Sequence, residues 1–225
     1  MSILSAILQA VVQGLTEFLP VSSSGHLALV QHFTNVQPED ATFLSAIMHL
    51  GTLVAVFIAF RKTILKLIIE FFTMLRDLFT GKFRIKGMNG YRRMILMLIL
   101  SLVPLFIILP FKGYYDELVA QSNLIFLGGC FLLTSILLYI SDRCVKGKKD
   151  EKSMKARDAL IIGTAQGIAV LPGVSRSGST VAASLICGLS KKFAVQFSFI
   201  LGIPAILGAG LVEIKDAIEM QASIE

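Results

Sequence analysis

Residues 13–26 read QGLTEFLPVSSSGH, and residues 166–179 read QGIAVLPGVSRSGS. The two stretches align without gaps at an offset of 153 residues, and six of their fourteen positions are identical. The apolar segments beside the second stretch, 158–171 and 180–189, are each too short to cross a hydrocarbon core about 30 Å thick. Irregular backbone at membrane depth is tolerated only inside the protein or beside water. The pattern therefore predicts two re-entrant broken helices with buried tips, at 20–25 and 172–179.

The composition of the chain favours a membrane protein. Of its 225 residues, 55% are hydrophobic and only 16% are charged, which does not suit a soluble protein with a single core. Stretches of roughly 20 apolar residues can span a bilayer. We expect an all-α, polytopic membrane helical bundle whose full spans lie near 41–60, 94–111, 123–140 and 193–212.

Most of the positive charge lies in two segments, which hold sixteen of the twenty-one Lys and Arg residues. No Lys or Arg precedes Arg61, whereas 61–93 contains nine and 143–157 contains seven of the twenty-one. The positive-inside rule places both segments in the cytoplasm and the N-terminus, without a cleavable signal peptide, on the outer side. This clustering at membrane-adjacent loops argues against nucleic acid as a partner. The amphipathic stretch 62–79 is expected to lie at the cytoplasmic interface.

This charge distribution makes the first broken helix enter from outside and the second from the cytoplasm. Such an arrangement is an inverted-topology repeat, in which two broken helices build a polar site near the midplane. We expect a single integral membrane domain over 1–225, with one repeat near 1–112 and the other near 113–225.

The second loop has the features of an anion site. Ser175, Arg176 and Ser177 come just before a predicted half-helix, so hydroxyls, backbone N–H groups and a guanidinium gather at a helix N-terminus. An Arg at membrane depth costs roughly 2.5 to 3.5 kcal/mol on insertion scales and normally has an anionic partner. We assign phosphate binding to these residues and to Thr180.

The first loop supplies complementary chemistry. Gln13 and Glu17 lie one helical turn apart and can share a cation or orient a water molecule. His26 can act as a general acid or base toward a neighbouring serine hydroxyl, and the serines at 22–24 offer a nucleophile and phosphate donors. Together the two loops suggest phosphoryl transfer on a lipid-borne phosphate, with Ser23 or water as the nucleophile.

The segments GLTEFLPVSSSGHL and PGVSRSGST closely resemble the two signature segments of the undecaprenyl-diphosphatase family, and the resemblance extends over nearly the whole chain. It implies hydrolysis of undecaprenyl diphosphate to undecaprenyl phosphate and inorganic phosphate, which recycles the lipid carrier for the cell wall and confers bacitracin resistance. It also implies a divalent cation, Mg²⁺ or Ca²⁺, and a bacterial plasma membrane enzyme with an active site facing outward.

The motif match assigns roles to individual residues. Gln13 and Glu17 fall on the metal-binding pair, with Glu17 also catalytic, and Arg176 is catalytic. Ser23 and His26 are the further catalytic residues, and substrate binding falls to Ser22, Ser24, Ser175, Ser177 and Thr180.

The chain departs from the family pattern in two ways. Position 13 is Gln where many members have Glu, which lowers the negative charge available to a metal. Members also usually continue for about two further spans of some 20 residues each. We expect those C-terminal spans to be missing from the 225 residues.

Other interpretations stay open at this stage. Ser24, Ser179 and Gly178 can serve close helix packing, and Glu17 and Arg176 can form a structural ion pair between the repeats. His49, within a predicted span, suits a structural or site-lining role. A lipid-phosphate or small-anion transporter also uses inverted repeats. A non-catalytic membrane subunit is a third class, and a homodimer is one assembly open to the chain.

Overall fold

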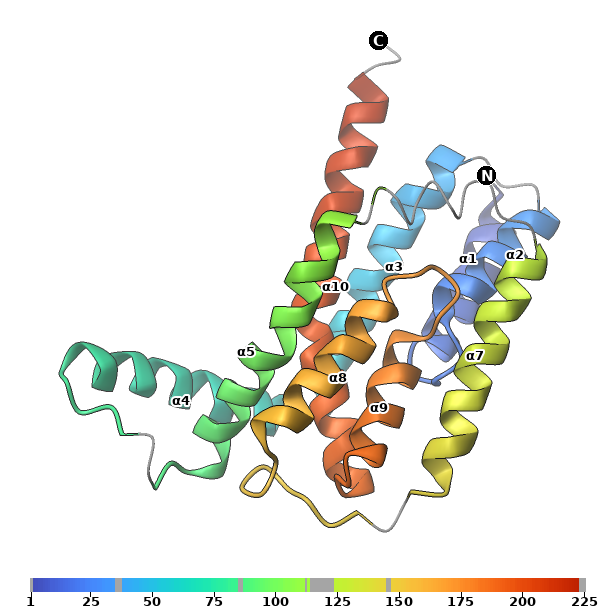
Figure 1. Ribbon diagram of the computed structural model, residues 1–225. Coiled ribbons are helices and arrows are strands. Elements are labelled where there is room, and N and C mark those ends of the chain that lie inside the picture. Colours follow the sequence, from blue (N-terminus) through green and yellow to red (C-terminus); the bar gives the residue numbers. More distant parts are fainter. Residues whose placement is uncertain are drawn as a thin grey trace.

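The computed structural model of the protein describes residues 2–34, 38–84, 87–111, 113, 124–144 and 147–222. Within this described part there is no β-strand and only one isolated β-bridge, between Lys149 and Leu189. The predicted all-α fold is therefore confirmed. In chain order (Figure 1) the helices are α1 (Ile3–Thr16), α2 (Ser23–Thr34), α3 (Pro38–Ala59), α4 (Arg61–Phe79), α5 (Gly90–Ile108), the short 3₁₀ helix η1 (Leu109–Phe111), α7 (Leu124–Asp142), α8 (Ala156–Ile168), α9 (Arg176–Ile186) and α10 (Lys191–Ala222).

Among the residues that the structure describes, three helices are long and apolar enough to cross a membrane, namely α5, α7 and the Lys191–Gly208 part of α10. They correspond to three of the four predicted spans. The fourth, 41–60, falls on α3, where the apolar stretch with described side chains, Leu44–Ala59, is shorter. Many large apolar side chains of these helices are exposed, as a lipid-facing surface requires. The chain is a polytopic membrane protein.

Two helical hairpins, α1–α2 and α8–α9, take the place of full spans. They point in opposite directions, and their closed ends meet inside the bundle (Figure 1). Their loops were predicted to extend over 20–25 and 172–179, but α2 already starts at Ser23 and α9 at Arg176. The predicted loops were too long because a serine directly before each helix caps it, so the remaining motif residues form the first helical turn.

The other long helices are also arranged in opposed pairs. Helix α3 runs away from the N-terminal end of the molecule and α10 runs back along it, while α5 and α7 run in opposite directions (Figure 1). An inverted-topology repeat requires the opposite directions of α3 and α10, which correspond at the offset of about 153 residues. The repeat itself, its boundary near residue 112 and the single domain over 1–225 stay predictions.

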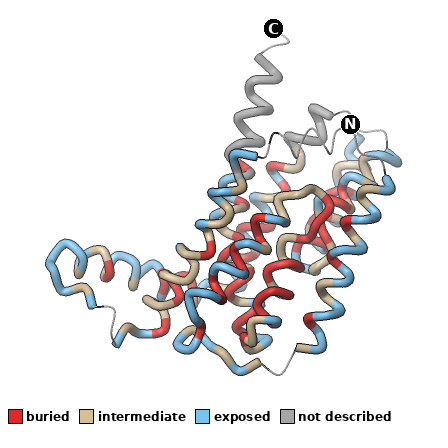
Figure 2. Tube along the Cα trace, in the orientation of Figure 1, coloured by how far each residue is buried: buried red, intermediate tan, exposed pale blue. Residues whose placement is uncertain are grey.

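The core surrounds the α8–α9 hairpin, where buried residues concentrate (Figure 2). Helix α5 packs along α8 so closely that a Cβ atom at Gly163 would lie 2.1 Å from the carbonyl oxygen of Ser101. Phe197 and Leu201 of α10 are fully buried against the same cluster. The hairpin that carries Arg176 is therefore held between helices on several sides.

Helix α4 projects sideways from the bundle (Figure 1). Arg92, at the start of α5, holds α4 against α5 through ion pairs of 2.8 Å to Glu70 and 2.8 Å to Asp77. The hydrogen bond from Arg92 also lowers the pKa of the Asp77 carboxyl from its ordinary value. Large apolar side chains elsewhere on α4 are exposed. The helix predicted over 62–79 is confirmed, and its place at a membrane interface stays a prediction.

The described parts of the two basic segments, 61–93 and 143–157, lie at the same end of the molecule, and the N-terminus lies at the other end (Figure 1). The positive-inside rule expects this distribution of charge in a membrane protein. That the basic end faces the cytoplasm stays a prediction.

Candidate active site

The two hairpin loops touch each other in the middle of the bundle. A Cβ atom at Gly178 would lie 2.9 Å from the carbonyl oxygen of Pro20, so only glycine permits this approach without a shift. Helix α7 packs against both loops: the backbone N–H of Ser175 donates to the Thr134 hydroxyl at 3.1 Å, and a Cβ at Gly25 would meet the Phe131 ring at 2.7 Å. The packing role considered for Gly178 is thus confirmed.

The two loops use the same capping hydrogen bonds. The Ser22 hydroxyl accepts from the backbone N–H of Gly25 at 3.3 Å, and the Ser175 hydroxyl accepts from that of Gly178 at 3.0 Å. Each capping serine also lies close to the serine two positions on, at 3.3 Å in the first loop and 3.4 Å in the second. The alignment at an offset of 153 residues therefore corresponds to equivalent local structure.

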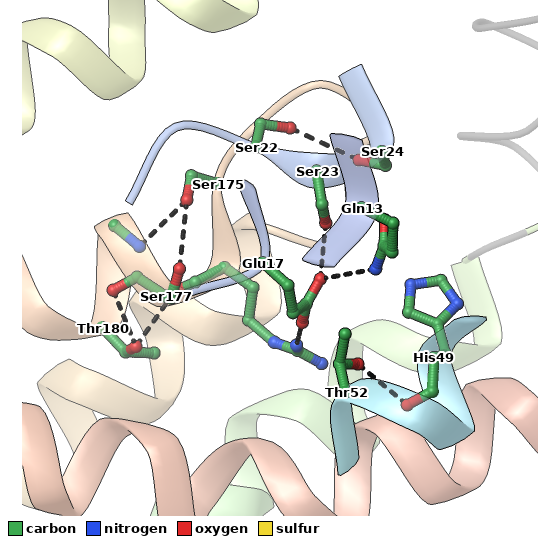
Figure 3. Close-up of polar contacts among 12 residues, drawn as sticks. Gln13, Glu17, Ser22, Ser23, Ser24, His49, Thr52, Ser175, Ser177 and Thr180 are labelled. Carbon is green, nitrogen blue, oxygen red and sulfur yellow. Dashed lines mark hydrogen bonds and ion pairs between the residues drawn. The ribbon is translucent and has the colours of Figure 1, made fainter. Parts of the chain in front are cut away.

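An ion pair joins the two hairpins. Arg176, in the first turn of α9, donates through Nη2 to Oε1 of Glu17 at 2.6 Å (Figure 3). Glu17 follows α1 and its side chain is only 7% exposed. The other carboxylate oxygen, Oε2, accepts from the Ser23 hydroxyl at 2.5 Å and from the Gln13 amide at 3.0 Å. A buried carboxylate is thus held by a guanidinium and two neutral donors, as its burial requires.

A small polar cavity of about 60 Å³ opens beside this pair. The N-terminal ends of α2 and α9 both border it, and such helix ends favour anions through their free N–H groups and partial positive charge. Its lining consists mainly of hydroxyl and charged side chains: Thr16, Glu17, Ser22, Ser23, Ser24, His49, Val174, Ser175, Arg176 and Ser177.

Seven of the predicted site residues line this cavity, and three do not. Gln13 is buried behind Glu17 and touches the site through it. The Thr180 hydroxyl donates to the backbone carbonyls of Arg176, at 3.0 Å, and of Ser177, at 3.3 Å. We therefore expect Thr180 to support the first turn of α9, and its assignment to substrate binding stays a prediction.

His26 does not belong to the lining of the cavity. Its Nδ1 is 2.8 Å from the carbonyl oxygen of Ser22, so Nδ1 carries the proton that the bond needs, and its ring packs against Phe131 at 5.1 Å between centroids. Ser22 has a φ of +70°, a left-handed conformation that is unfavourable for a non-glycine residue. His26 thus helps to hold a strained turn, and its role in proton transfer stays a prediction.

Another histidine lines the cavity. His49 of α3 belongs to the lining, its Nδ1 is 3.4 Å from the Ser45 hydroxyl, and its ring lies beside Gln13 (Figure 3). The site-lining alternative for His49 is thereby confirmed. The only sequence signal was an imidazole inside an otherwise apolar predicted span.

The residues at the cavity suit a divalent cation that takes few ligands from the protein. Glu17 is the one acidic residue of the lining, and the described part of the chain has no cluster of three His, Cys, Asp or Glu side chains that could hold a metal. Behind it, Oε1 of Gln13 is buried with no hydrogen-bond partner among the described residues. Mg²⁺ often takes one or two carboxylates and completes its shell with water and substrate phosphates. These donors suit a cation shared with a phosphorylated substrate.

Comparison with known proteins identifies the family to which the chain belongs. The family model "Bacitracin resistance protein BacA" matches residues 6–225. A protein named undecaprenyl-diphosphatase from Alkaliphilus metalliredigens is 44% identical over 221 residues, which cover 98% of this chain and 79% of that protein. Proteins of the same name from Methanosphaera stadtmanae and Carboxydothermus hydrogenoformans are 41% and 37% identical, covering 99% and 100% of this chain and 81% and 78% of theirs. The chain, with its paired loops and buried Glu17–Arg176 contact, belongs to the bacitracin resistance protein BacA family.

Proposed function

We propose that the protein hydrolyses undecaprenyl diphosphate to undecaprenyl phosphate and inorganic phosphate within the membrane. The observation that carries this proposal is the polar cavity between the two hairpins, where a guanidinium and two helix N-termini surround one buried carboxylate. The relatives named undecaprenyl-diphosphatase support the substrate and the reaction.

The second loop would bind the diphosphate. Ser175 and Ser177 present hydroxyls to the cavity, and Arg176 presents a guanidinium that now pairs with Glu17. Substrate oxygens can take over this guanidinium, since charge-assisted bonds to phosphate are strong and often bidentate. The resting ion pair is thus compatible with a binding role, because the substrate replaces one anionic partner by another.

The first loop would then carry out the chemistry. The Ser23 hydroxyl already donates to Glu17 at 2.5 Å, so Glu17 can accept a proton from Ser23 or from a water molecule in its place. The nucleophile attacks the terminal phosphorus, the bond to the bridging oxygen breaks, and undecaprenyl phosphate leaves. If Ser23 attacks, water must afterwards cleave the phosphoserine, whereas direct attack by water needs one step.

A divalent cation, Mg²⁺ or Ca²⁺, would neutralise part of the diphosphate charge when bound. Glu17 and Gln13 are the residues that would hold it. Gln13 already orients the Glu17 carboxylate through its amide N–H, and its free amide oxygen is a neutral ligand. Replacement of Gln13 by Glu should then raise cation affinity.

The cellular role follows from this reaction. Product release on the outer side would return the lipid carrier to cell-wall synthesis and would confer resistance to bacitracin. The membrane concerned would be the bacterial plasma membrane, with the cavity reached from the outer face and the substrate drawn from the surrounding lipid.

The test is phosphate release from undecaprenyl diphosphate by the purified full chain in detergent, with and without EDTA. Cation-dependent release supports the proposal. The opposed hairpins also suit a lipid-phosphate or small-anion transporter, and tight binding without turnover would favour that class.

A further inference from the structure

Helix α1 carries a polar stripe that leads from one end of the molecule to the candidate active site. Ser5, Gln9, Gln13 and Glu17 follow one another at every fourth position and therefore share one helix face. Gln9 is 0%, Gln13 1% and Glu17 7% exposed, whereas Ser5 is partly exposed. The N-terminal turn of α1 lies at the end of the bundle, and the helix runs inward from there (Figure 1).

The opposite face of α1 is apolar and open. Leu4, Leu8, Val11 and Leu15 are 78%, 45%, 52% and 63% exposed. The helix thus turns its apolar side outward, where lipid would lie, and its polar side inward. Polar side chains inside a membrane protein are costly and commonly mark pathways for ions, protons or substrates.

Hydrogen bonds connect part of the stripe. The Gln9 amide donates to the Ser5 hydroxyl at 3.3 Å and accepts from Gln31 of α2 at 3.1 Å. Further in, Gln13 donates to Glu17 at 3.0 Å. A packing contact between α1 and α2 would account for the bonds of Gln9, but those bonds leave the inner end of the stripe unexplained.

The inner end is marked by Gln13. Its Oε1 is buried and has no hydrogen-bond partner among the described residues, which is costly for an amide oxygen. Side chains four positions apart on a helix are neighbours, and a buried water molecule typically bonds to buried polar groups that are otherwise unsatisfied. Water between Gln9 and Gln13 would satisfy this oxygen and make the stripe continuous.

We propose that the face formed by Ser5, Gln9, Gln13 and Glu17 is a hydrated path along which water reaches the candidate active site. The proposal rests on the hydrolysis proposed above, in which water is the second substrate. The lipid diphosphate comes from the bilayer, so its own entry does not supply water. The neutral hydroxyl and amide of the outer positions, Ser5 and Gln9, suit this task because they bind water without holding cations or phosphate by charge.

Accessibility of Gln9 to water tests the path directly. In the full-length protein in lipid vesicles, Gln9→Cys should react with a small water-soluble thiosulfonate about tenfold faster than Leu8→Cys, because a thiol in apolar surroundings seldom ionises. Leu8 is the matched control, one residue away on the exposed apolar face. Peptide mass shifts report each site separately from the native cysteines. Labelling needs no turnover, so its outcome is independent of whether the protein is a phosphatase.

A kinetic pair separates a water path from a packing contact. Gln9→Leu should block the path and lower kcat for phosphate release about threefold to tenfold, with the KM for undecaprenyl diphosphate unchanged. Gln9→Ser removes the same bond to Gln31 but leaves room for water, so its kcat should stay close to that of the wild type. Equal labelling of Gln9→Cys and Leu8→Cys would overturn the proposal. So would Gln9→Ser losing as much kcat as Gln9→Leu.

Discussion

The two re-entrant loops share one capping hydrogen bond but carry opposite charges. Both end in a capping serine, Ser22 or Ser175, with a glycine three positions later that donates to it. At the aligned positions, however, the first loop has Glu17 where the second has an apolar valine, and Arg176 stands where the first has a serine. Equivalent capping bonds thus hold both loops, while the substitutions at these two positions divide the chemistry between them.

The backbones also differ in where they place the left-handed residue. In the first loop this residue is Ser22 itself, with a φ of +70°, whereas the second loop uses Gly173, with a φ of +93°. Glycine adopts this conformation without penalty and serine does not. The loop that carries the carboxylate thus has the more strained turn, which is braced by the bond between His26 and the Ser22 carbonyl.

Exchange of the charges at Glu17 and Arg176 should have the largest effect and tests the division of roles between the loops. The single variants Glu17→Arg and Arg176→Glu should each lose about 3–5 kcal/mol of stability, because each leaves a buried charge without its partner. The double variant restores an ion pair and should recover most of that loss in thermal unfolding, yet remain inactive. Phosphate release by the double variant would mean that the division of roles between the loops is incorrect.

Removal of the guanidinium alone should have the next largest effect. We expect Arg176→Ala to lower kcat for phosphate release about 10²–10³-fold, the loss typical of a group that stabilises transition-state charge. Arg176→Lys keeps the charge but not the planar fork, so its loss should be smaller. The Glu17 carboxylate can still pair with the lysine, which makes this variant the control for folding. Equal losses in both variants would indicate that charge contributes little.

The contact between the loops can be tested with two glycines. Gly178→Ala should cost about 1–3 kcal/mol, because its Cβ would press on the Pro20 carbonyl oxygen at 2.9 Å. Gly14→Ala, on α1 with no atom within 4 Å of its Cβ, is the matched control and should be neutral or stabilising. Thermal unfolding of the two variants compares them. A neutral Gly178→Ala would contradict the close approach.

The smallest expected effects are the stability losses on removal of the capping serines, and they test whether the two caps contribute equally. Ser22→Ala and Ser175→Ala should each lower stability by about 0.5–2 kcal/mol through the lost helix cap. Because both serines accept a hydrogen bond from the backbone N–H three positions later, the two losses should be similar. A much smaller loss at Ser22 would show that its bond to Gly25 contributes little, since alanine keeps the left-handed strain at that position.

Much of the site could be predicted from the sequence because its signals are local. The alignment of the loops, their serines and the unusual charges at Glu17 and Arg176 can be read without tertiary structure, and these residues do meet. The ion pair between them was one of the alternatives, and it is present. The early starts of α2 and α9 were missed because a serine in such a motif suits a loop as well as an N-cap.

Long-range packing accounts for what could not be predicted. His49 lines the cavity because α3 packs against α1, and no spacing rule relates these two segments. His26 was expected beside a serine hydroxyl, but its ring packs on Phe131 of α7, more than one hundred positions away in the chain. The direction of a side chain thus depends on neighbours that the motif does not contain.

The central claim is that both loops form one phosphatase site whose essential carboxylate is Glu17. The most direct measurement is phosphate release from undecaprenyl diphosphate by the wild type and by Glu17→Gln, purified side by side and both shown to bind the substrate. We predict cation-dependent release by the wild type and a loss of about 10²–10⁴-fold in the variant, as expected when a general base is removed. Release by Glu17→Gln at the rate of the wild type, or none by a wild type that binds the substrate, would contradict the claim.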